Sequence, residues 1–299
     1  MKKIAENRYP HSANLFKFCK EALALRYDGN GKIIDQDVGA ILGYDPADCS
    51  HWKKGKKNIR ALATLKSLAD YLQIDERLLI DIAAGKMDLT EAVFEYKGYG
   101  NFSLSGASLE NFKKDFFKHP EKWQQEGERR TFEELFDLNR EGVARVVSYI
   151  LRDRTDEAPV YLPEIFGRIP GIDLVVTPEL NEDFAVESHG DQTSLRMIVR
   201  YKDSEMRPYV RYLAAKQLFL FLYRSHHEYC ADLITAPEEV TDIRGNIFAG
   251  MLLIPPALLR REMEKIDSSF DVVLQLANAF WVSKSLMNKR LADYMEHRN

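Results

Sequence analysis

Four lysines lie between residues 53 and 57, directly after a run of small and polar side chains. Ammonium groups can neutralise the phosphates of a nucleic acid, and small or polar side chains can reach base edges in a groove. The candidate contact residues in this stretch are Ala47, Asp48, Ser50, His51, Lys53, Lys54, Lys56 and Lys57. A run of lysines by itself is usually just a solvated surface. Whether this one binds nucleic acid depends on the helices that position it.

The residues from Asp35 to Gly43 predict a short helix before this stretch. Asp35 can cap the helix, because its carboxylate can accept hydrogen bonds from the free N–H groups of the first turn. Val38, Ile41 and Leu42 fall three and four residues apart, so they share one apolar face. Gly43 is suited to the left-handed conformation in which many helices end.

A second short helix is predicted to begin after Asp45, which can cap it. Pro46 is tolerated at the first helical position, where the backbone N–H has no intrahelical partner. Cys49 and Trp52 lie three residues apart and are expected to point inward, and Gly55 is expected to end the helix. The polar side chains and the lysines of this stretch are then left on the exposed side.

Amphipathic helices are predicted on both sides of this pair, from Ala13 to Arg26 and from Ala61 to Leu72, and Asp75 can cap a fifth helix that ends at Ala84. Five short helices in this order resemble the Xre/lambda-repressor class of helix-turn-helix domains over residues 13–86. The residues that carry the resemblance are Val38, Gly39, Leu42, Gly43, Trp52, Gly55, Lys56, Leu65, Leu68, Ala69, Leu72, Leu78 and Leu79. The resemblance implies binding to double-stranded DNA.

Two acids depart from the pattern of that class. Asp35 falls where the class usually has glutamine or another polar residue that tolerates a phosphate, and a carboxylate there would repel one. We therefore expect Asp35 to cap the helix and Gln36 to contact the DNA backbone. Asp48 is unusual in a recognition helix, although an acid can accept a hydrogen bond from the amino group of cytosine.

The length of 299 residues is enough for about two domains and a sizeable core. Residues 1–87 carry 15 Lys and Arg against 11 Asp and Glu, whereas the rest of the chain carries 27 against 35. A basic part that can meet DNA is thus joined to an acidic part. The excess is modest, so we expect DNA binding to depend strongly on salt and to need two copies of the domain.

Residues 88–137 are predicted to connect the two parts. Residues 96–108 place glycine, serine and asparagine between aromatics, which indicates a loop or short hairpin. Two charged helical pieces, Glu110–Gln125 and Thr131–Leu138, contain several aromatic residues. We expect this segment to pack on something, such as a partner subunit.

Residues 138–299 predict helices around a small sheet. The expected strands are Ile172–Val176, Phe184–Glu187 and Leu195–Tyr201, followed by helices at Arg207–Tyr223 and Arg244–Leu253. Further helices are expected at Pro256–Lys265 and Phe270–Ala279, with Ser283 as the cap of a last one. The expected fold class is mainly α, with a five-helix lambda-repressor-like domain and an α+β domain with a small sheet.

The order of these elements resembles the ImmA/IrrE family of metallopeptidase-like domains, which implies a zincin-like fold. The stretches that carry the resemblance are Pro159–Ile165, Gly171–Ile172, Arg211–Ala215, Asn246–Pro255, Leu276–Ser283 and Arg290–Leu291. Active members carry H-E-x-x-H, in which two histidines hold zinc and the glutamate activates a water. Lys216, Gln217 and Leu220 stand at the matching positions here, and the third, acidic ligand would fall at Asp242.

These replacements predict a vestigial site without zinc or another cofactor. Lysine at neutral pH and leucine do not ligate zinc, and glutamine cannot take a proton from water. Lys216 and Asp242 would form an ion pair if they meet, or Lys216 would extend to solvent. His226, His227 and Cys230 offer an alternative metal reading, but their spacing gives no complete ligand set.

Hydrophobic residues make up 45% of the chain and charged residues 29%, and no apolar run approaches the length of a spanning helix. The N-terminal residues do not form a secretory signal, and the three scattered cysteines suit a reducing cytoplasm. We expect a cytoplasmic, homodimeric DNA-binding transcriptional regulator of repressor type. Its C-terminal domain is expected to be catalytically inactive and to dimerise or bind a protein or small-molecule effector. The alternatives are a peptidase with an unrecognised site and a protein-binding adaptor.

Overall fold

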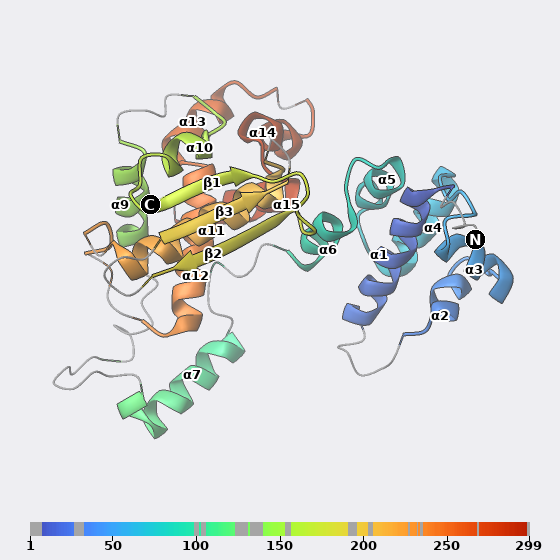
Figure 1. Ribbon diagram of the computed structural model, residues 1–299, viewed down its shortest axis with the longest axis horizontal. Helices are drawn as coiled ribbons and strands as arrows, with labels where there is room; N and C mark the ends of the chain where they lie inside the picture. Colours follow the sequence, from blue (N-terminus) through green and yellow to red (C-terminus); the bar gives the residue numbers. More distant parts are fainter. Residues whose placement is uncertain are drawn as a thin grey trace. The chain divides into compact units, whose positions relative to one another are not determined.

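The computed structural model describes residues 8–26, 33–98, 102, 106–122, 131, 140–152, 157–190, 196–202, 206–226, 228–231, 233, 236–267 and 269–297. The chain divides into two compact units, Met1–Gly98 (unit 1) and Tyr99–Asn299 (unit 2), and each is described by itself (Figure 1). The described residues are mainly helical, with a three-stranded mixed sheet in unit 2. Among them, no helix combines the length and the apolar composition needed to cross a membrane.

The described residues of unit 1 form helices joined by turns and loops, without a strand. Its helices are α1 (Pro10–Arg26), α2 (Asp35–Ala40), α3 (Pro46–Lys53), α4 (Leu62–Leu72), α5 (Glu76–Ala84) and α6 (Leu89–Lys97). The first five lie where helices were predicted, although α1 begins at Pro10 rather than at Ala13 and α2 ends at Ala40 rather than at Gly43. Leu62, the first residue of α4, is exposed.

Helix α6 includes residues 96 and 97 of the loop or hairpin predicted at 96–108, of which residues 99–101 and 103–105 lie outside the described residues and residues 106–108 begin another helix. Asp88 caps the helix by accepting a hydrogen bond from the backbone N–H of Glu91, and the helix continues through Lys97. The ring of Tyr96 packs edge-on against Phe18 of α1 at a centroid distance of 5.9 Å. Unit 1 therefore extends to Gly98, beyond the domain boundary expected at residue 87.

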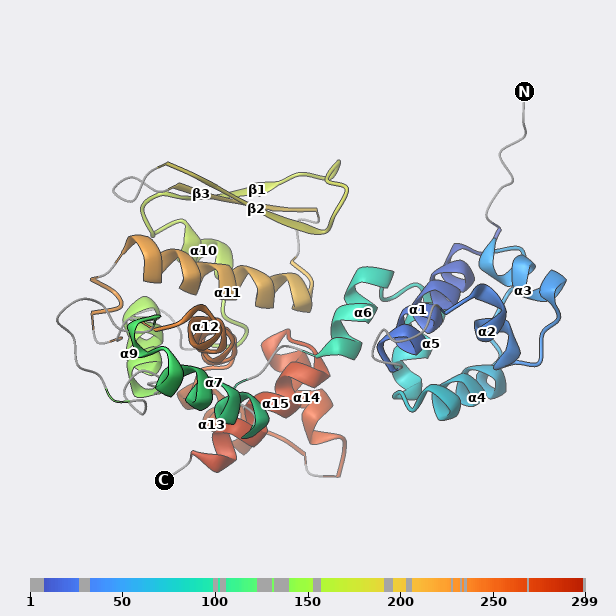
Figure 2. The same cartoon turned by 90° about the horizontal axis from the view of Figure 1, so that it is seen from below.

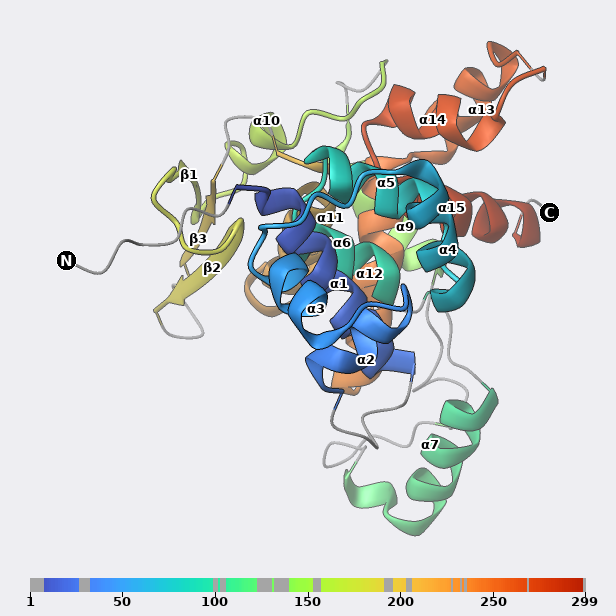
Figure 3. The ribbon, with the colours of Figure 1, turned by 90° about the vertical axis from the view of Figure 1, so that its right-hand side faces the viewer.

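The core of unit 1 forms around α1, which contacts each of the other five helices (Figure 3). Phe16 and Phe18 of α1, Trp52 of α3 and Ala92 of α6 are all fully buried or nearly so. Burial of large aromatic side chains is the main stabilising contribution in a unit of this size. The same packing determines which faces of α2 and α3 stay exposed.

Unit 2 combines helices with the sheet. Its helices are α7 (Gly106–Lys118), α9 (Arg140–Ile150), α10 (Leu162–Phe166), α11 (Pro208–Ser225), α12 (Glu238–Leu253), α13 (Pro256–Glu264), α14 (Val272–Phe280) and α15 (Lys284–Glu296), with a 3-10 turn at Pro120–Lys122. Its strands are β1 (Ile172–Val176), β2 (Phe184–His189) and β3 (Arg196–Tyr201). The three strands lie where the sequence predicted them.

The sheet has the order β1-β3-β2. Strands β1 and β3 are parallel, with Ile172 opposite Met197, and β2 and β3 are antiparallel, with Phe184 opposite Tyr201. Met197, Val199 and Tyr201 alternate along β3 and are buried. This buried side covers α11, and the sheet and α12 lie on opposite sides of that helix (Figure 2).

Two predicted helices of unit 2 have different bounds. Helix α12 begins at Glu238 rather than at Arg244, so Asp242 lies on the helix. Helix α7 spans Gly106–Lys118 rather than Glu110–Gln125, and the helix predicted at Thr131–Leu138 lies outside the described residues except for Thr131. Ser283 caps α15 as predicted, by accepting a hydrogen bond from the N–H of Leu286 at 3.0 Å.

Candidate nucleic-acid interface

Helices α2 and α3 pack closely because of two glycines. Gly43 adopts a left-handed backbone conformation in the turn, and Gly39 leaves room for α3. Gly43 has a φ of +67°, and the backbone N–H of Tyr44 bonds to the carbonyl of Gly39 at 3.0 Å. A Cβ at Gly39 would lie 2.8 Å from the Cβ of Cys49, so only glycine permits this approach of the two helices. The sequence signals for the turn are confirmed.

Helix α3 is anchored through its buried face. Asp45 caps it by accepting a hydrogen bond from the N–H of Asp48 at 2.8 Å, as predicted. The ring of Trp52 packs edge-on against Phe16 at 5.1 Å and against Tyr44 at 6.0 Å, and Cys49 is buried beside it. The opposite face of α3 is consequently held outward.

The predicted contact residues lie on that outward face and in the loop after it, except Gln36, which lies on α2. Five of them are exposed: Ala47, His51, Lys53, Lys54 and Lys56. Four are half-buried: Gln36, Asp48, Ser50 and Lys57. The side-chain amide of Gln36 donates to the carbonyl of Tyr44 at 3.3 Å, so this residue already has an intramolecular partner.

The prediction that Asp35 caps α2 is wrong. The N-cap residue is Ile34, whose backbone is extended, and its N–H donates to the carboxylate of Asp37 at 2.8 Å. Asp35 is the first helical residue, and its carboxylate instead accepts from Lys20 of α1 at 2.7 Å and from Lys53 of α3 at 2.5 Å. Hydrogen bonds from Lys20 and then Lys53 hold the pKa of Asp35 below its ordinary value.

Lys57 is also held by its neighbours. Its ammonium lies 3.0 Å from a carboxylate oxygen of Asp48 and 3.7 Å from the centre of the Tyr44 ring. Lys54 and Lys56, by contrast, form no ion pair with any residue that the structure describes. These two are the lysines whose charge is most available to a phosphate.

In unit 2 two of the four residues predicted to form a vestigial site, Lys216 and Asp242, lie next to each other. The ammonium of Lys216 on α11 lies 2.6 Å from a carboxylate oxygen of Asp242 on α12, with side-chain exposures of 19% and 51%. The stem of Lys216 lies over Gly245, where an added Cβ would sit 3.3 Å from its Cγ. Gln217 and Leu220 are half-buried on the same helix, and neither side chain can take the place of a zinc-binding histidine.

A buried hydrogen bond next to this pair was not predicted. The hydroxyl of Tyr212 donates to the side-chain oxygen of Asn246 at 2.7 Å. Burial, and secondly the carboxylate of Asp242, raise the pKa of Tyr212. Tyr212 and Lys216 are one turn apart on α11, and Asp242 and Asn246 are one turn apart on α12. That shared spacing is the sequence signal that could have revealed the second link.

The alternative hypothesis of a metal site at His226, His227 and Cys230 gains no support from the described residues. They contain no cluster of three potential metal ligands. His226 hydrogen-bonds to Glu228 at 3.1 Å and to the carbonyl of Pro170 at 3.2 Å. Cys230 is buried, and this burial raises its pKa to about 12. His227 lies outside the described residues.

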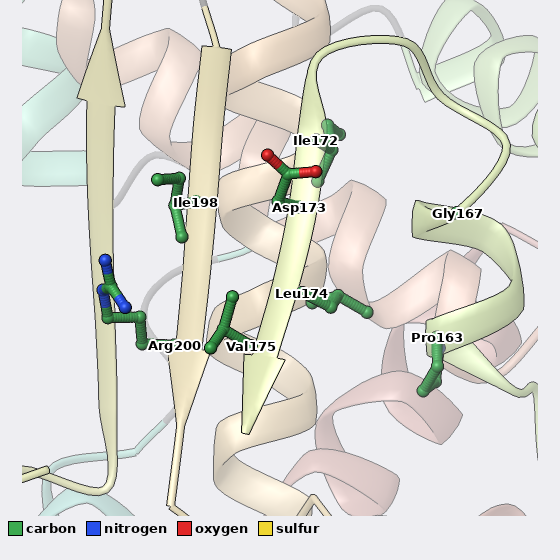
Figure 4. A pocket seen from close by; sticks show the side chains of 8 residues that line it. All are labelled: Pro163, Gly167, Ile172, Asp173, Leu174, Val175, Ile198 and Arg200. Carbon is green, nitrogen blue, oxygen red and sulfur yellow. The ribbon is translucent and has the colours of Figure 1, made fainter. Parts of the chain in front are cut away.

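A hollow of about 570 Å³ lies elsewhere in unit 2, between the sheet and α10. Pro163, Gly167, Ile172, Asp173, Leu174, Val175, Ile198 and Arg200 line it (Figure 4). Asp173 pairs with Arg196 at 3.2 Å, and Arg200 pairs with Glu187 at 3.0 Å. The volume suits a small molecule, but the hollow does not include the residues of the vestigial site.

Comparisons with known proteins leave the chain without an assigned family: no family model, no curated protein and no solved structure matches it.

Proposed function

We propose that the protein is a sequence-specific DNA-binding transcriptional regulator of repressor type. The observation that supports this most is the exposed face of α3, with Ala47 and His51 followed by Lys53, Lys54 and Lys56. The buried Trp52 holds the helix so that these side chains point away from the core. A rigid helix with small and polar groups beside a basic loop has the form needed to enter a major groove.

The proposal assigns different tasks to the two kinds of side chain. Lys54 and Lys56 contact phosphates, which orient the protein without reading sequence. His51, with Ala47 and Ser50, contacts base edges. One such unit covers little DNA, so two copies bind together as a homodimer on a site with two-fold symmetry.

For unit 2 we propose a role without catalysis. Zinc-dependent hydrolysis of a peptide bond at the vestigial site would need two zinc ligands and a general base on α11. Lys216, Gln217 and Leu220 supply none of these. The ion pair of Lys216 with Asp242 instead joins α11 to α12. Unit 2 then serves dimerisation or the binding of an effector, for which the hollow beside α10 is the candidate location.

In vitro selection of duplexes from a random pool, with the full-length protein, tests the DNA-binding proposal. We expect enrichment of a near-palindromic motif. The variant His51→Ala should select a changed motif, because each lost base contact costs about 1–3 kcal/mol of discrimination. Failure of the wild-type protein to enrich any sequence would refute the proposal and favour a protein-binding adaptor.

A further inference from the structure

The carboxylate of Asp35 joins three helices through charge. Lys20 lies on α1, Asp35 is the first residue of α2, and Lys53 is the last residue of α3. The two ammonium groups lie 2.7 and 2.5 Å from different oxygens of the one carboxylate. The thiol of Cys49 also donates to the backbone carbonyl of Asp35 at 2.9 Å, which holds this residue against α3.

This carboxylate offers the lysines the same interaction that a phosphate would offer. Both groups present anionic oxygens that accept charge-assisted hydrogen bonds from ammonium N–H groups. The side chains of Lys20 and Lys53 remain 38% and 51% exposed, so a phosphate can reach them. It must, however, replace a partner that the protein already supplies.

We propose that Asp35 is an internal competitor for DNA phosphates that limits the affinity of the interface for DNA of any sequence. The inference rests on the proposed DNA-binding function. By occupying Lys20 and Lys53, Asp35 lowers the contribution of phosphate contacts to binding. A larger share of the binding free energy then comes from the base contacts of α3, which are the contacts that carry sequence information.

A second carboxylate, on α3 itself, acts in the same sense. Asp48 pairs with Lys57 at 3.0 Å. Replacing Asp48 would alter the recognition helix itself, so its effects on phosphate contacts and on base contacts could not be separated. Asp35 lies outside α3 and allows a cleaner test.

Asp37 provides a matched control in the same helical turn. It carries the same charge two residues away and pairs with no lysine among the described residues. The full-length variants Asp35→Asn and Asp37→Asn are compared with wild type for binding to a mixed-sequence duplex about two helical turns long. Fluorescence anisotropy is measured over a series of KCl concentrations, and thermal melting verifies that each variant is folded.

Asp35→Asn should bind roughly 2- to 30-fold more tightly at low salt, because two exposed ion pairs no longer compete. The slope of log K against log salt should steepen by about 1 to 2, since up to two more lysines release counterions from DNA. Asp37→Asn should leave the slope unchanged. Equal behaviour of the two variants, or no change in either, would overturn the proposal.

Lys20→Gln adds one comparison in the wild-type background, which does not require Asp35→Asn to fold, and a second comparison in the Asp35→Asn background. In the wild-type background it should weaken binding less than Lys54→Gln, whose ammonium has no competing carboxylate among the described residues. In the Asp35→Asn background the loss from Lys20→Gln should grow. Equal losses from Lys20→Gln in the two backgrounds would show that Asp35 does not compete. If wild type and all variants bind no duplex, the DNA-binding function itself is wrong.

Discussion

The indole N–H of Trp52 donates a hydrogen bond to the backbone carbonyl of Ser12 at 2.9 Å, which joins α3 to the beginning of α1. The hydroxyl of the same serine accepts from the backbone N–H of Ile59 at 2.7 Å. Ser12 therefore links both ends of the segment that carries the lysines to the core helix. All three residues are buried.

The first prediction concerns this link. Ser12→Ala leaves the buried N–H of Ile59 without its partner and should lower the free energy of unfolding by about 1–3 kcal/mol. Chemical denaturation of the full-length protein measures it. Ser67→Ala is the control, because the exposed hydroxyl of Ser67 donates to the carbonyl of Ala63 on the same helix and its loss should change stability by less than about 0.5 kcal/mol. Equal stability of the two variants would contradict the role assigned to Ser12.

The second prediction concerns Lys54 and Lys56. Their joint replacement by alanine should weaken binding to all duplexes alike and reduce the slope of log K against log salt by about 2, since two phosphate contacts are lost. Lys113→Ala with Lys114→Ala removes two exposed lysines of α7 and should leave DNA binding unchanged. If both double variants bind as wild type at every salt concentration, the surface of α3 does not contact DNA.

The third prediction concerns the vestigial site. Wild-type protein should contain no stoichiometric zinc after purification without chelator. The triple variant Lys216→His, Gln217→Glu, Leu220→His should bind about one zinc ion, because it places two imidazoles one turn apart on α11 within reach of Asp242. Elemental analysis decides between these outcomes.

Adding Asp242→Ala to that triple variant is the control, and it should weaken zinc binding again by removing the third ligand. Stoichiometric zinc in the wild-type protein would mean that a metal site lies elsewhere. A triple variant that folds but binds no zinc would contradict the proposed likeness to a zinc-peptidase site.

The fourth prediction concerns pH. The pKa of Asp35 is lowered from 3.8 by Lys20 and Lys53, so the unfolded chain takes up a proton before the folded protein does. The stabilisation by this carboxylate is therefore complete above pH 3.8 and is lost as the pH falls through the lower folded value. Urea denaturation of wild type and Asp35→Asn should differ by at most about 2 kcal/mol at neutral pH, since each of the two exposed ion pairs contributes about 0–1 kcal/mol. The difference should vanish in acid, and one that persists there would contradict the assignment.

Local signals were sufficient to predict the helix pair. Asp45 and Pro46 act within the first turn of α3, and Gly43 acts at the turn itself, so each effect depends only on a few adjacent residues. The strands were predicted for a similar reason, since their apolar runs are bounded by turn residues. Helix α6 was not predicted, because the glycine and tyrosine residues from Tyr96 onward suggested a loop and the cap at Asp88 was not recognised.

Contacts between distant residues could not be predicted in the same way. Asp35 is of a residue type that often caps the N-terminus of a helix. Its actual partners, Lys20 on α1 and Lys53 on α3, are brought to it only by folding. The bond between Trp52 and Ser12 joins residues 40 positions apart. An ion pair between Lys216 and Asp242 was predicted only on the condition that the two residues meet. They do meet because α12 begins early enough to include Asp242. The first turns of α12 are largely polar and were not predicted as helix.

The close approach of Gly39 to Cys49 makes the cysteine a natural reporter of local opening. Its sulfur would lie 2.9 Å from a Cβ at Gly39 and is buried, so a thiol reagent cannot attack while α2 and α3 remain in contact. Burial also raises the pKa of Cys49, which keeps the reactive thiolate scarce. The labelling rate of this thiol would therefore report how often the two helices separate, without an introduced cysteine.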